Sequence, residues 1–314
     1  MAERRETYYL AGFLIGAGLL LFLGRDLLQG SVVATWGLTF GGTTAVAVLG
    51  AALYRVRLEL QASRRQLARK EAELSFAREV QVALFPRRLP VKGGLEFSGI
   101  CIPARGISGD YYDVMQLPDG RLVFAIADIS GKGISAAIIM ANLQAVLRTL
   151  AGSNLSPCEV CSRLNQHLLQ VTDESKFATF FYAEWNPVES RLRYINAGHH
   201  VPIAVGSAEG RRLSEGGFPL GLFPDATFEM GDAFLRPGDL LVLYSDGITE
   251  ASSRKGVEFG EGRLRNLIEE HRDEPLAQIQ RRVIDAVRQW SGEEPEDDMT
   301  LLIVRATANV EENR

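Results

Sequence analysis

The sequence predicts an α+β domain behind two apolar N-terminal segments and a charged helix. Residues 8–24 and 31–54 contain no charged side chain, whereas residues 55–84 are rich in charge and contain neither glycine nor proline. From residue 94 onward, short runs typical of strands are interspersed with helix-like stretches. Strand runs and segregated helices together indicate an α+β class, in which helices cover the sheet cores.

The composition favours a folded, acidic domain and argues against a nucleic-acid partner. Apolar residues make up 46% of the 314 residues, enough for at least one full core. After residue 90 the chain holds 32 acidic and 22 basic residues, so it lacks the basic stripe that binds phosphate backbones. Residues 1–90 hold 12 basic and 7 acidic residues, an excess that suits an anionic membrane surface.

Residues 1–54 are predicted to form a transmembrane hairpin. Its two apolar runs have 17 and 24 residues, and a span needs about 20, within a range of about 17–25. A signal peptide is the alternative for the first run, but a second apolar run follows at once and an Ala-x-Ala site is lacking. Arginines flank the hairpin on its outer ends, at positions 4, 5, 55, 57, 64 and 65. The positive-inside rule therefore places both termini in the cytoplasm.

Residues 55–89 are predicted to form a helical linker. Leu53, Leu60, Leu67 and Leu74 recur every seven residues and would form one stripe on a helix, but the partner positions are mixed. Two interpretations remain open: a solvated spacer, or a parallel dimeric coiled coil that carries a signal from the membrane. The prolines at 86 and 90 end the helix.

Residues 90–308 are predicted to form the folded domain, followed by a tail at 309–314. The expected strands are 95–104, 111–117, 121–128, 179–185, 191–195, 240–244 and 299–304. Residues 134–150 form an apolar and therefore buried helix, and 157–171 are helix-like. Apolar residues between 276 and 290 have the spacing of an amphipathic helix.

Four aspartates share one placement, at the end of a predicted strand. They are Asp110, Asp128, Asp246 and Asp297. A cluster of carboxylates is unfavourable without cations, and hard divalent ions would neutralise it. Ligands that are all oxygen favour Mg²⁺ or Mn²⁺ over zinc. Each aspartate taken alone could equally cap a turn or a helix, so the hypothesis depends on the set.

Seven motifs occur in an order that identifies a resemblance. They are AREVQVALFP (77–86), SGDYYD (108–113), DISGKG (128–133), NAGH (196–199), PLG (219–221), YSDGITE (244–250) and DDMT (297–300). Together they resemble the bacterial stage-II-sporulation-E-like phosphatases, metal-dependent PP2C-type enzymes that control partner switching of sigma factors. The resemblance covers residues 75–306 and implies a PP2C-like β-sandwich flanked by helices.

The resemblance also implies roles for individual residues. Asp128 would bridge two Mn²⁺ or Mg²⁺ ions, Asp246 and Asp297 would bind one of them, and the carbonyl of Ile129 the other. Asp110 would be a further ligand, either directly or through water. The remaining candidates are Asp113 and Asp298, expected to support the ligands from outside, and Arg105, expected to contact the substrate phosphate or to be a surface residue.

The implied function is a membrane-anchored serine/threonine phosphatase with its catalytic domain in the bacterial cytoplasm. The expected substrate is a phosphorylated anti-sigma-factor antagonist of the STAS type, and the expected assembly is a homodimer through the linker. A catalytically inactive scaffold that binds such a partner is the alternative. A sensor histidine kinase is disfavoured because residues 55–84 contain no histidine.

Overall fold

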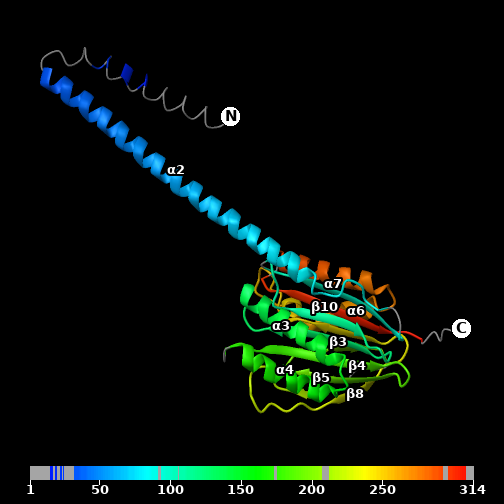
Figure 1. Cartoon of the computed structure of the whole chain (residues 1–314). Coiled ribbons are helices and arrows are strands. Elements are labelled where there is room, and N and C mark those ends of the chain that lie inside the picture. The colour runs from blue at the N-terminus through cyan, green and yellow to red at the C-terminus, as the bar shows by residue number, and fades with distance from the viewer. Residues whose placement is uncertain are drawn as a thin grey trace. The chain divides into compact units, whose positions relative to one another are not determined.

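The structure is a computed structural model that describes most of the chain (Figure 1). The described residues are 15, 16, 18, 19, 22, 24, 32–90, 93–104, 106–172, 175–206, 212–292 and 296–308. The chain divides into two compact units, Met1–Glu73 and Leu74–Arg314.

A long helix, α2 (Val32–Val82), accounts for most of the first unit and ends in the second. The helix covers residues 55–82 of the segment predicted to be helical, and it begins more than 20 residues earlier than the charged segment does. Large apolar side chains along it are exposed, among them Trp36, Phe40 and Leu53. Most of the first predicted span lies outside the described residues.

Among the described residues, one helix is long and apolar enough to cross a membrane, and it is α3 (Ile134–Ala151). Its buried side chains, including Met140, Leu143 and Leu147, belong to an apolar core of the second unit. This matches the prediction of a buried helix at 134–150. The transmembrane hairpin at 1–54 accordingly stays a prediction.

The second unit contains two β-sheets and five helices among its described residues. The strands are β1 (Leu95–Ile102), β2 (Tyr111–Gln116), β3 (Leu122–Ile129), β4 (Ala178–Asn186), β5 (Arg191–Ala197), β6 (Ile203–Val205), β7 (Gly216–Gly217), β8 (Gly231–Phe234), β9 (Leu240–Tyr244) and β10 (Met299–Ala306). The helices after α3 are α4 (Pro157–Val171), α5 (Asp246–Thr249), α6 (Gly260–Glu270) and α7 (Leu276–Ser291). The strands β6 to β8 were not predicted, because two to four residues are too few to show a periodicity.

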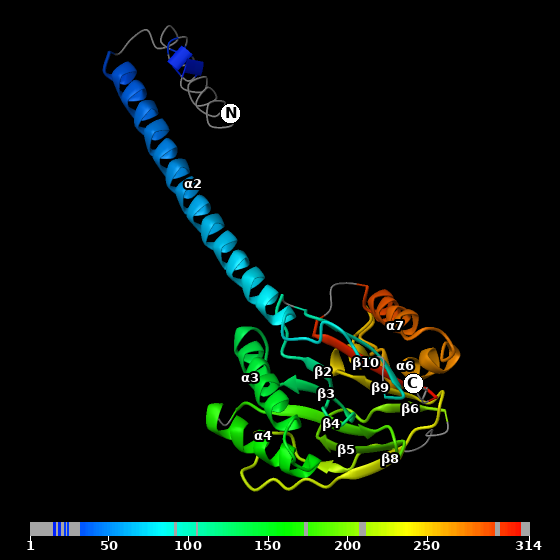
Figure 2. The same ribbon diagram turned by 45° about the vertical axis from the view of Figure 1, so that its right-hand side comes forward.

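One sheet has the strand order β1-β10-β9-β6, and the other β2-β3-β4-β5-β7 with β8 also paired to β5. All pairs are antiparallel except β5 with β7. Helices α3 and α4 cover the outer face of the second sheet, and α6 and α7 cover that of the first (Figure 2). The unit is thus a four-layer sandwich, as an α+β class implies.

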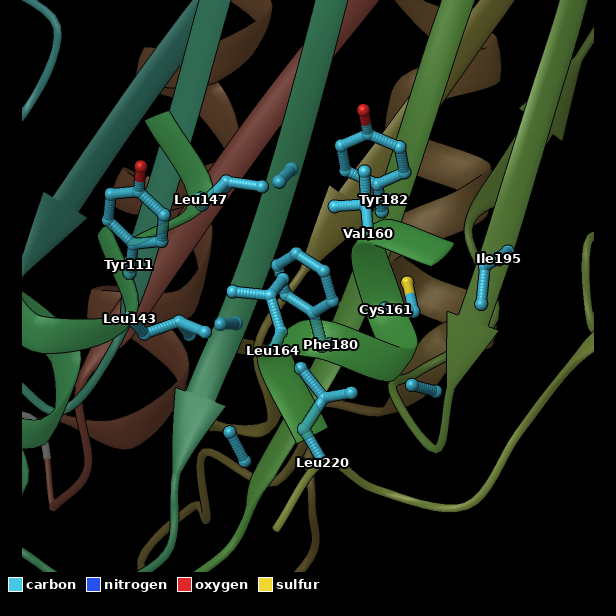
Figure 3. Close-up of a cluster of buried hydrophobic side chains, with 14 of the residues drawn as sticks. Tyr111, Leu143, Leu147, Val160, Cys161, Leu164, Phe180, Tyr182, Ile195 and Leu220 are labelled. Carbon is cyan, nitrogen blue, oxygen red and sulfur yellow. The ribbon is translucent and has the colours of Figure 1, made fainter. Parts of the chain in front are cut away.

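Three apolar cores separate the four layers. The central core joins both sheets through residues such as Phe124, Phe181 and Leu302. A second core lies between one sheet and the helices α3 and α4, where Leu143 and Leu164 face Phe180 (Figure 3). The third lies under α6 and α7. Strand side chains alternate between two buried faces, which explains why these strands are apolar throughout.

Candidate active site

Asp110 and Asp128 lie side by side at one end of the second sheet. Asp128 is the penultimate residue of β3 and pairs with Thr179 of β4. Asp110 immediately precedes β2. In the antiparallel register Tyr111 faces Ala127, so the next pair outward is Asp110 and Asp128. The sheet therefore fixes the spacing of these two carboxylates.

Asp246 and Asp297 meet in the same way where β9 ends and β10 begins. The Ser245 amide donates to the Thr300 carbonyl at 3.0 Å, and the Thr300 amide donates to the Ser245 hydroxyl at 2.9 Å. The Ser245 hydroxyl in turn donates to the carbonyl of Asp298 at 3.1 Å. These bonds hold the segments that carry Asp246 and Asp297 against each other.

Gly247 shows how closely these two segments approach. A Cβ atom at this position would lie 2.2 Å from the carbonyl oxygen of Asp298 and 3.2 Å from the carbonyl carbon of Asp297. Both neighbours are backbone atoms, which cannot rotate away. The glycine after Asp246 is therefore required for the approach, and it is the second residue of the Asp-Gly pair that the sequence singles out.

Asp298 ties the two sheets together at the site. Its carboxylate accepts from the amides of Ala104 and Gly109 and from the hydroxyl of Ser108, each at 2.8 Å. The Ser108 hydroxyl also accepts from the amide of Asp110 at 2.9 Å. Asp298 thus supports the loop that carries Asp110.

The carboxylates raise one another's pKa. Burial is the largest cause for each, and it raises the pKa of Asp110, of Asp128 to about 7, and of Asp246. The charge of Asp128 adds to the effect on Asp110, and the charges of Asp246 and Asp297 add to that on Asp128. Such a set is unfavourable when ionised and would be stabilised by a bound cation.

Two further observations fit a cation that binds oxygen. The Oδ2 atom of Asp110 is buried and has no hydrogen-bond partner among the described residues. The carbonyl of Ile129 faces Gly109, and a Cβ atom at Gly109 would lie 3.2 Å from its oxygen. A larger residue would therefore crowd that carbonyl. The donors agree with Mg²⁺ or Mn²⁺ chemistry.

The oxygen donors suit a divalent cation chemically, but their positions do not form a complete ligand set. Among the described residues, no three His, Cys, Asp or Glu side chains are close enough together to hold a metal ion as they stand. The Lys132 ammonium lies 2.6 Å from Asp297 Oδ2 and donates to the Glu296 carbonyl at 3.3 Å. Lys132 thus neutralises part of the charge at the position where the resemblance expects a ligand.

The carboxylate of Asp113 lies on the face of its sheet that α3 covers, where it binds Arg148 of that helix. Its carboxylate accepts from Arg148 Nε at 2.7 Å, from Arg148 Nη2 at 2.9 Å and from the Tyr111 hydroxyl at 2.5 Å. We find no contact between Asp113 and the four aspartates in the described residues, so its expected supporting role is not what its contacts indicate. Arg105 lies outside the described residues.

The two adjacent histidines differ in their surroundings. His199 is buried, its Nδ1 atom is 2.8 Å from the Thr179 hydroxyl, and burial lowers its pKa to about 3. A neutral, enclosed imidazole of this kind fits a structural role. His200 is exposed, stacks on Tyr244 with ring centroids 5.6 Å apart, and its charge lowers the pKa of Asp246.

A cavity of about 250 Å³ adjoins the aspartates. Its lining includes Asp246, Asp297 and Lys132, and also Arg254 and Arg288. Neither arginine was a candidate from the sequence, since one lies in a turn and the other on an amphipathic helix, and no local pattern joins them.

Sequence patterns mark the positions of some site residues but do not give their contacts. Examples are Gln81, Lys132 and Asp298. Gln81 hydrogen-bonds to the backbone of Ser108, 27 residues later. Gln81 and Lys132 both stand inside motifs of the resemblance, which mark their positions without giving their partners. Asp298 was a candidate because it adjoins Asp297.

The family of stage II sporulation protein E (SpoIIE) matches residues 118–307. Phosphoserine phosphatase RsbU of Bacillus subtilis is 31% identical over 237 residues, which cover 75% of this chain and 70% of that protein. Two further curated relatives are longer, and the chain spans 35% and 57% of their lengths.

Solved structures share the fold. The SiaA-PP2C domain of Pseudomonas aeruginosa superposes with a TM-score of 0.67 at 20% identity, over 76% of this chain and 98% of that one. RsbX, solved in complex with magnesium, superposes with a TM-score of 0.54 at 16% identity, over 70% of this chain and 98% of that one. The expected PP2C-like fold is thereby confirmed.

Proposed function

Because the chain belongs to the SpoIIE family and has the PP2C fold, we propose that it is a metal-dependent protein serine/threonine phosphatase. The single observation that carries the proposal is that four carboxylates, one buried and three partly exposed, lie at neighbouring strand ends. The charges of Asp246 and Asp297 raise the pKa of Asp128, and the charge of Asp128 raises that of Asp110. Carboxylates that raise one another's pKa do not help to stabilise the fold. Cation binding explains why these side chains lie together.

The proposed ligands are Asp110, Asp128, Asp246 and Asp297, together with the carbonyl of Ile129. Their oxygens suit two Mn²⁺ or Mg²⁺ ions, and the magnesium complex of RsbX is consistent with this choice. A cation at Asp297 would compete with Lys132 for this carboxylate, because the ammonium and the cation are both positively charged. Asp298 supports the set through the loop before Asp110.

The proposed reaction is hydrolysis of a phosphoserine or phosphothreonine ester by water. Bound divalent cations supply positive charge that acidifies water and offsets charge on the phosphoryl oxygens. The water oxygen bonds to phosphorus as the ester P–O bond breaks, giving inorganic phosphate and the free hydroxyl. The aspartates hold their positions through the rigid strand ends, and no protein nucleophile is required, so no covalent phosphoenzyme is expected.

The test is phosphate release from an aryl phosphate by the full-length protein with Mn²⁺, with Mg²⁺ and with chelator. Asp246→Asn keeps the size of the side chain and removes its charge. We expect turnover that requires a metal and falls at least 100-fold in this variant, since a lost ligand costs more than the 10–100-fold typical of groups behind the ligands. A folded protein without turnover in any metal would contradict the proposal and favour the scaffold.

The proposed substrate is a small phosphorylated protein of the anti-sigma-factor-antagonist type, by analogy with RsbU. The proposed location is the bacterial cytoplasmic membrane, with residues 1–54 as the anchor. Support for the anchor comes from the uncharged runs at 8–24 and 31–54. Partition of the full-length protein into the membrane fraction, and its loss when residues 1–54 are deleted, would test the anchor.

We also propose that the linker forms a parallel homodimer. Leu53, Leu60 and Leu67 recur every seven residues on α2 and are each more than half exposed in the single chain. An apolar stripe of this kind favours a partner helix. A fragment beginning at Arg55 should therefore be dimeric at micromolar concentration. A monomeric and fully active fragment would exclude a role for dimerisation.

A further inference from the structure

Two arginines line the cavity that adjoins the aspartates, and they lie on different elements. Arg254 belongs to the loop between α5 and α6, and Arg288 to the last turn of α7. A Cβ atom placed on Gly292, which follows α7, would lie 3.5 Å from Arg254 Nε. The side chain of Arg254 therefore extends to the end of the helix that carries Arg288.

The loop that carries Arg254 is fixed to α7. The indole nitrogen of Trp290 donates to the carbonyl of Val257 at 2.9 Å, and the ring of Trp290 packs edge-on against Phe259. Within the loop, the amide of Ser253 donates to the carbonyl of Val257 at 2.9 Å. Because the loop is bonded at both places, the position of Arg254 relative to α7 does not depend on a substrate.

Both guanidinium groups are exposed, and neither forms an ion pair with a carboxylate in the part of the chain that the structure describes. Other arginines of the same unit are paired, for example Arg121 with Glu184 and Arg282 with Glu274. Among the described residues, Glu250 and Glu296 line the same cavity but form no ion pair with either arginine, so both guanidinium groups gain from an anion supplied by a ligand.

We infer that Arg254 and Arg288 bind a carboxylate of the substrate, from an aspartate or glutamate close in sequence to the phosphorylated residue. The inference rests on the proposed phosphatase function and adds a substrate class to it. The phosphoryl group would lie at the end of the cavity lined by Asp246 and Asp297. A compact cavity of this volume is about 8 Å across, which about two to three extended residues span. The acidic residue would thus stand within about three positions of the phosphoserine.

The charge of the domain explains why such a contact would matter for the choice of substrate. The chain after residue 90 carries ten more acidic than basic residues, so an acidic peptide is repelled at long range. Only a local pair of cations can make an acidic flank favourable, and guanidinium groups match carboxylate oxygens in a bidentate manner. The contact would therefore determine which phosphorylated segment is bound productively.

The experiment compares three substrates of the full-length protein with Mn²⁺: an aryl phosphate, a phosphoserine peptide with Glu two positions away, and the same peptide with Gln there. The variants are Arg254→Gln, Arg288→Gln and their combination. Arg281→Gln is the matched control, because Arg281 is an exposed arginine of α7 that does not line the cavity. Thermal unfolding would verify that all variants fold.

For the double variant we expect KM for the Glu peptide to rise about 5- to 20-fold with little change in kcat, given the strength of exposed charge-assisted pairs. The Gln peptide, the aryl phosphate and the control variant should change less than twofold. Arg288→Glu should reverse the preference toward a peptide with Lys in place of Glu. Equal losses on both peptides, or no loss on either, would overturn the inference.

Two other outcomes separate the inference from the function on which it rests. If KM for the aryl phosphate rises as much as that for the Glu peptide, the arginines bind the phosphoryl group and the inference is wrong. If the unmodified protein shows no metal-dependent hydrolysis of the aryl phosphate, the proposed function itself fails. The second result requires no variant.

Discussion

The side chain of Gln81 forms two hydrogen bonds with the backbone of Ser108. Its amide nitrogen donates to the Ser108 carbonyl at 2.7 Å, and its amide oxygen accepts from the Ser108 amide at 2.9 Å. Ser108 in turn binds Asp298 and the amide of Asp110 through its hydroxyl. The end of α2 thus supports the loop from which Asp110 enters the site.

Replacement of Gln81 should affect both stability and metal binding. Gln81→Met keeps the length of the side chain but leaves two buried backbone groups of Ser108 unpaired, at a cost of about 1–3 kcal/mol. Because the loop also carries Asp110, we expect a higher Mn²⁺ concentration at half-maximal activity. Metal titration of aryl phosphate hydrolysis would measure this.

Gln144→Met is a matched control for that variant. Gln144 also donates to a backbone carbonyl, that of Leu84 at 3.2 Å, but it lies on α3 and has no bond to the loop before Asp110. It should lose stability without a change in metal dependence. Identical metal titrations for Gln81→Met and the unmodified protein would show that the loop holds its position without Gln81.

Metal-free protein should become less stable as the pH rises from about 4 to about 7. The pKa of Asp128 in the folded protein is about 7, against an ordinary value of 3.8, so the folded state binds more protons in this window. The free energy of unfolding therefore falls with rising pH. We expect a change on the order of 2 kcal/mol, since neighbouring carboxylates share the effect and solvent screens part of it.

Urea unfolding of the metal-stripped protein at pH 5, 6 and 7.5 would measure this dependence. Asp128→Asn should flatten it, because the amide does not titrate. Mn²⁺ should raise the melting temperature more at pH 7.5 than at pH 5. If the free energy of unfolding of Asp128→Asn changed with pH as steeply as that of the unmodified protein, other groups would cause the dependence.

Gly247→Ala should be strongly destabilising. The new Cβ atom would lie 2.2 Å from the backbone oxygen of Asp298, so the segments that carry Asp246 and Asp297 would have to separate. We expect a loss of more than about 3 kcal/mol, or an inactive folded protein. Gly262→Ala on α6 serves for comparison, since nothing lies within 4 Å of its Cβ and alanine favours the helix by up to about 1 kcal/mol. Equal stabilities of the two variants would refute the close approach.

Arg148→Met should destabilise the domain without a direct effect on catalysis. It leaves the fully buried Asp113 carboxylate without its bidentate partner. Loss of one member of a buried pair costs about 3–5 kcal/mol, and the partial exposure of Arg148 lowers our expectation to about 2–3 kcal/mol. The double variant with Asp113→Asn should recover part of the lost stability, because it removes the buried, unpaired charge. A fall in kcat at a temperature where the variant is folded would instead connect Asp113 to the metal site.

The sequence predicted the elements whose periodicity extends over many residues. The helices α3, α4 and α7 and the strands β1 to β5, β9 and β10 are where the spacing of apolar residues placed them. The strand-end position of the four aspartates followed from the same patterns. Their mutual approach did not, because the register between strands is set by tertiary packing.

Contacts between distant residues were beyond the reach of sequence patterns. Asp113 stands three residues after Asp110 and was grouped with it, but alternation along β2 is not enough to tell which core a polar side chain faces. Arg148, which binds it, is 35 residues away on α3. The juxtaposition of Arg254 with α7 likewise depends on the bond between Trp290 and Val257.

The position of β10 in its sheet has a consequence for biosynthesis. This strand is the last of the described elements, but it lies between β1 and β9 and supplies the only strand partner of β1 in the described sheet. Asp297 and Asp298 directly precede it. A nascent chain on the ribosome can therefore form the second sheet early, but its active site stays incomplete until residues 299–306 emerge. Premature termination before β10 would yield an inactive protein with an exposed sheet edge, which quality-control proteases can recognise.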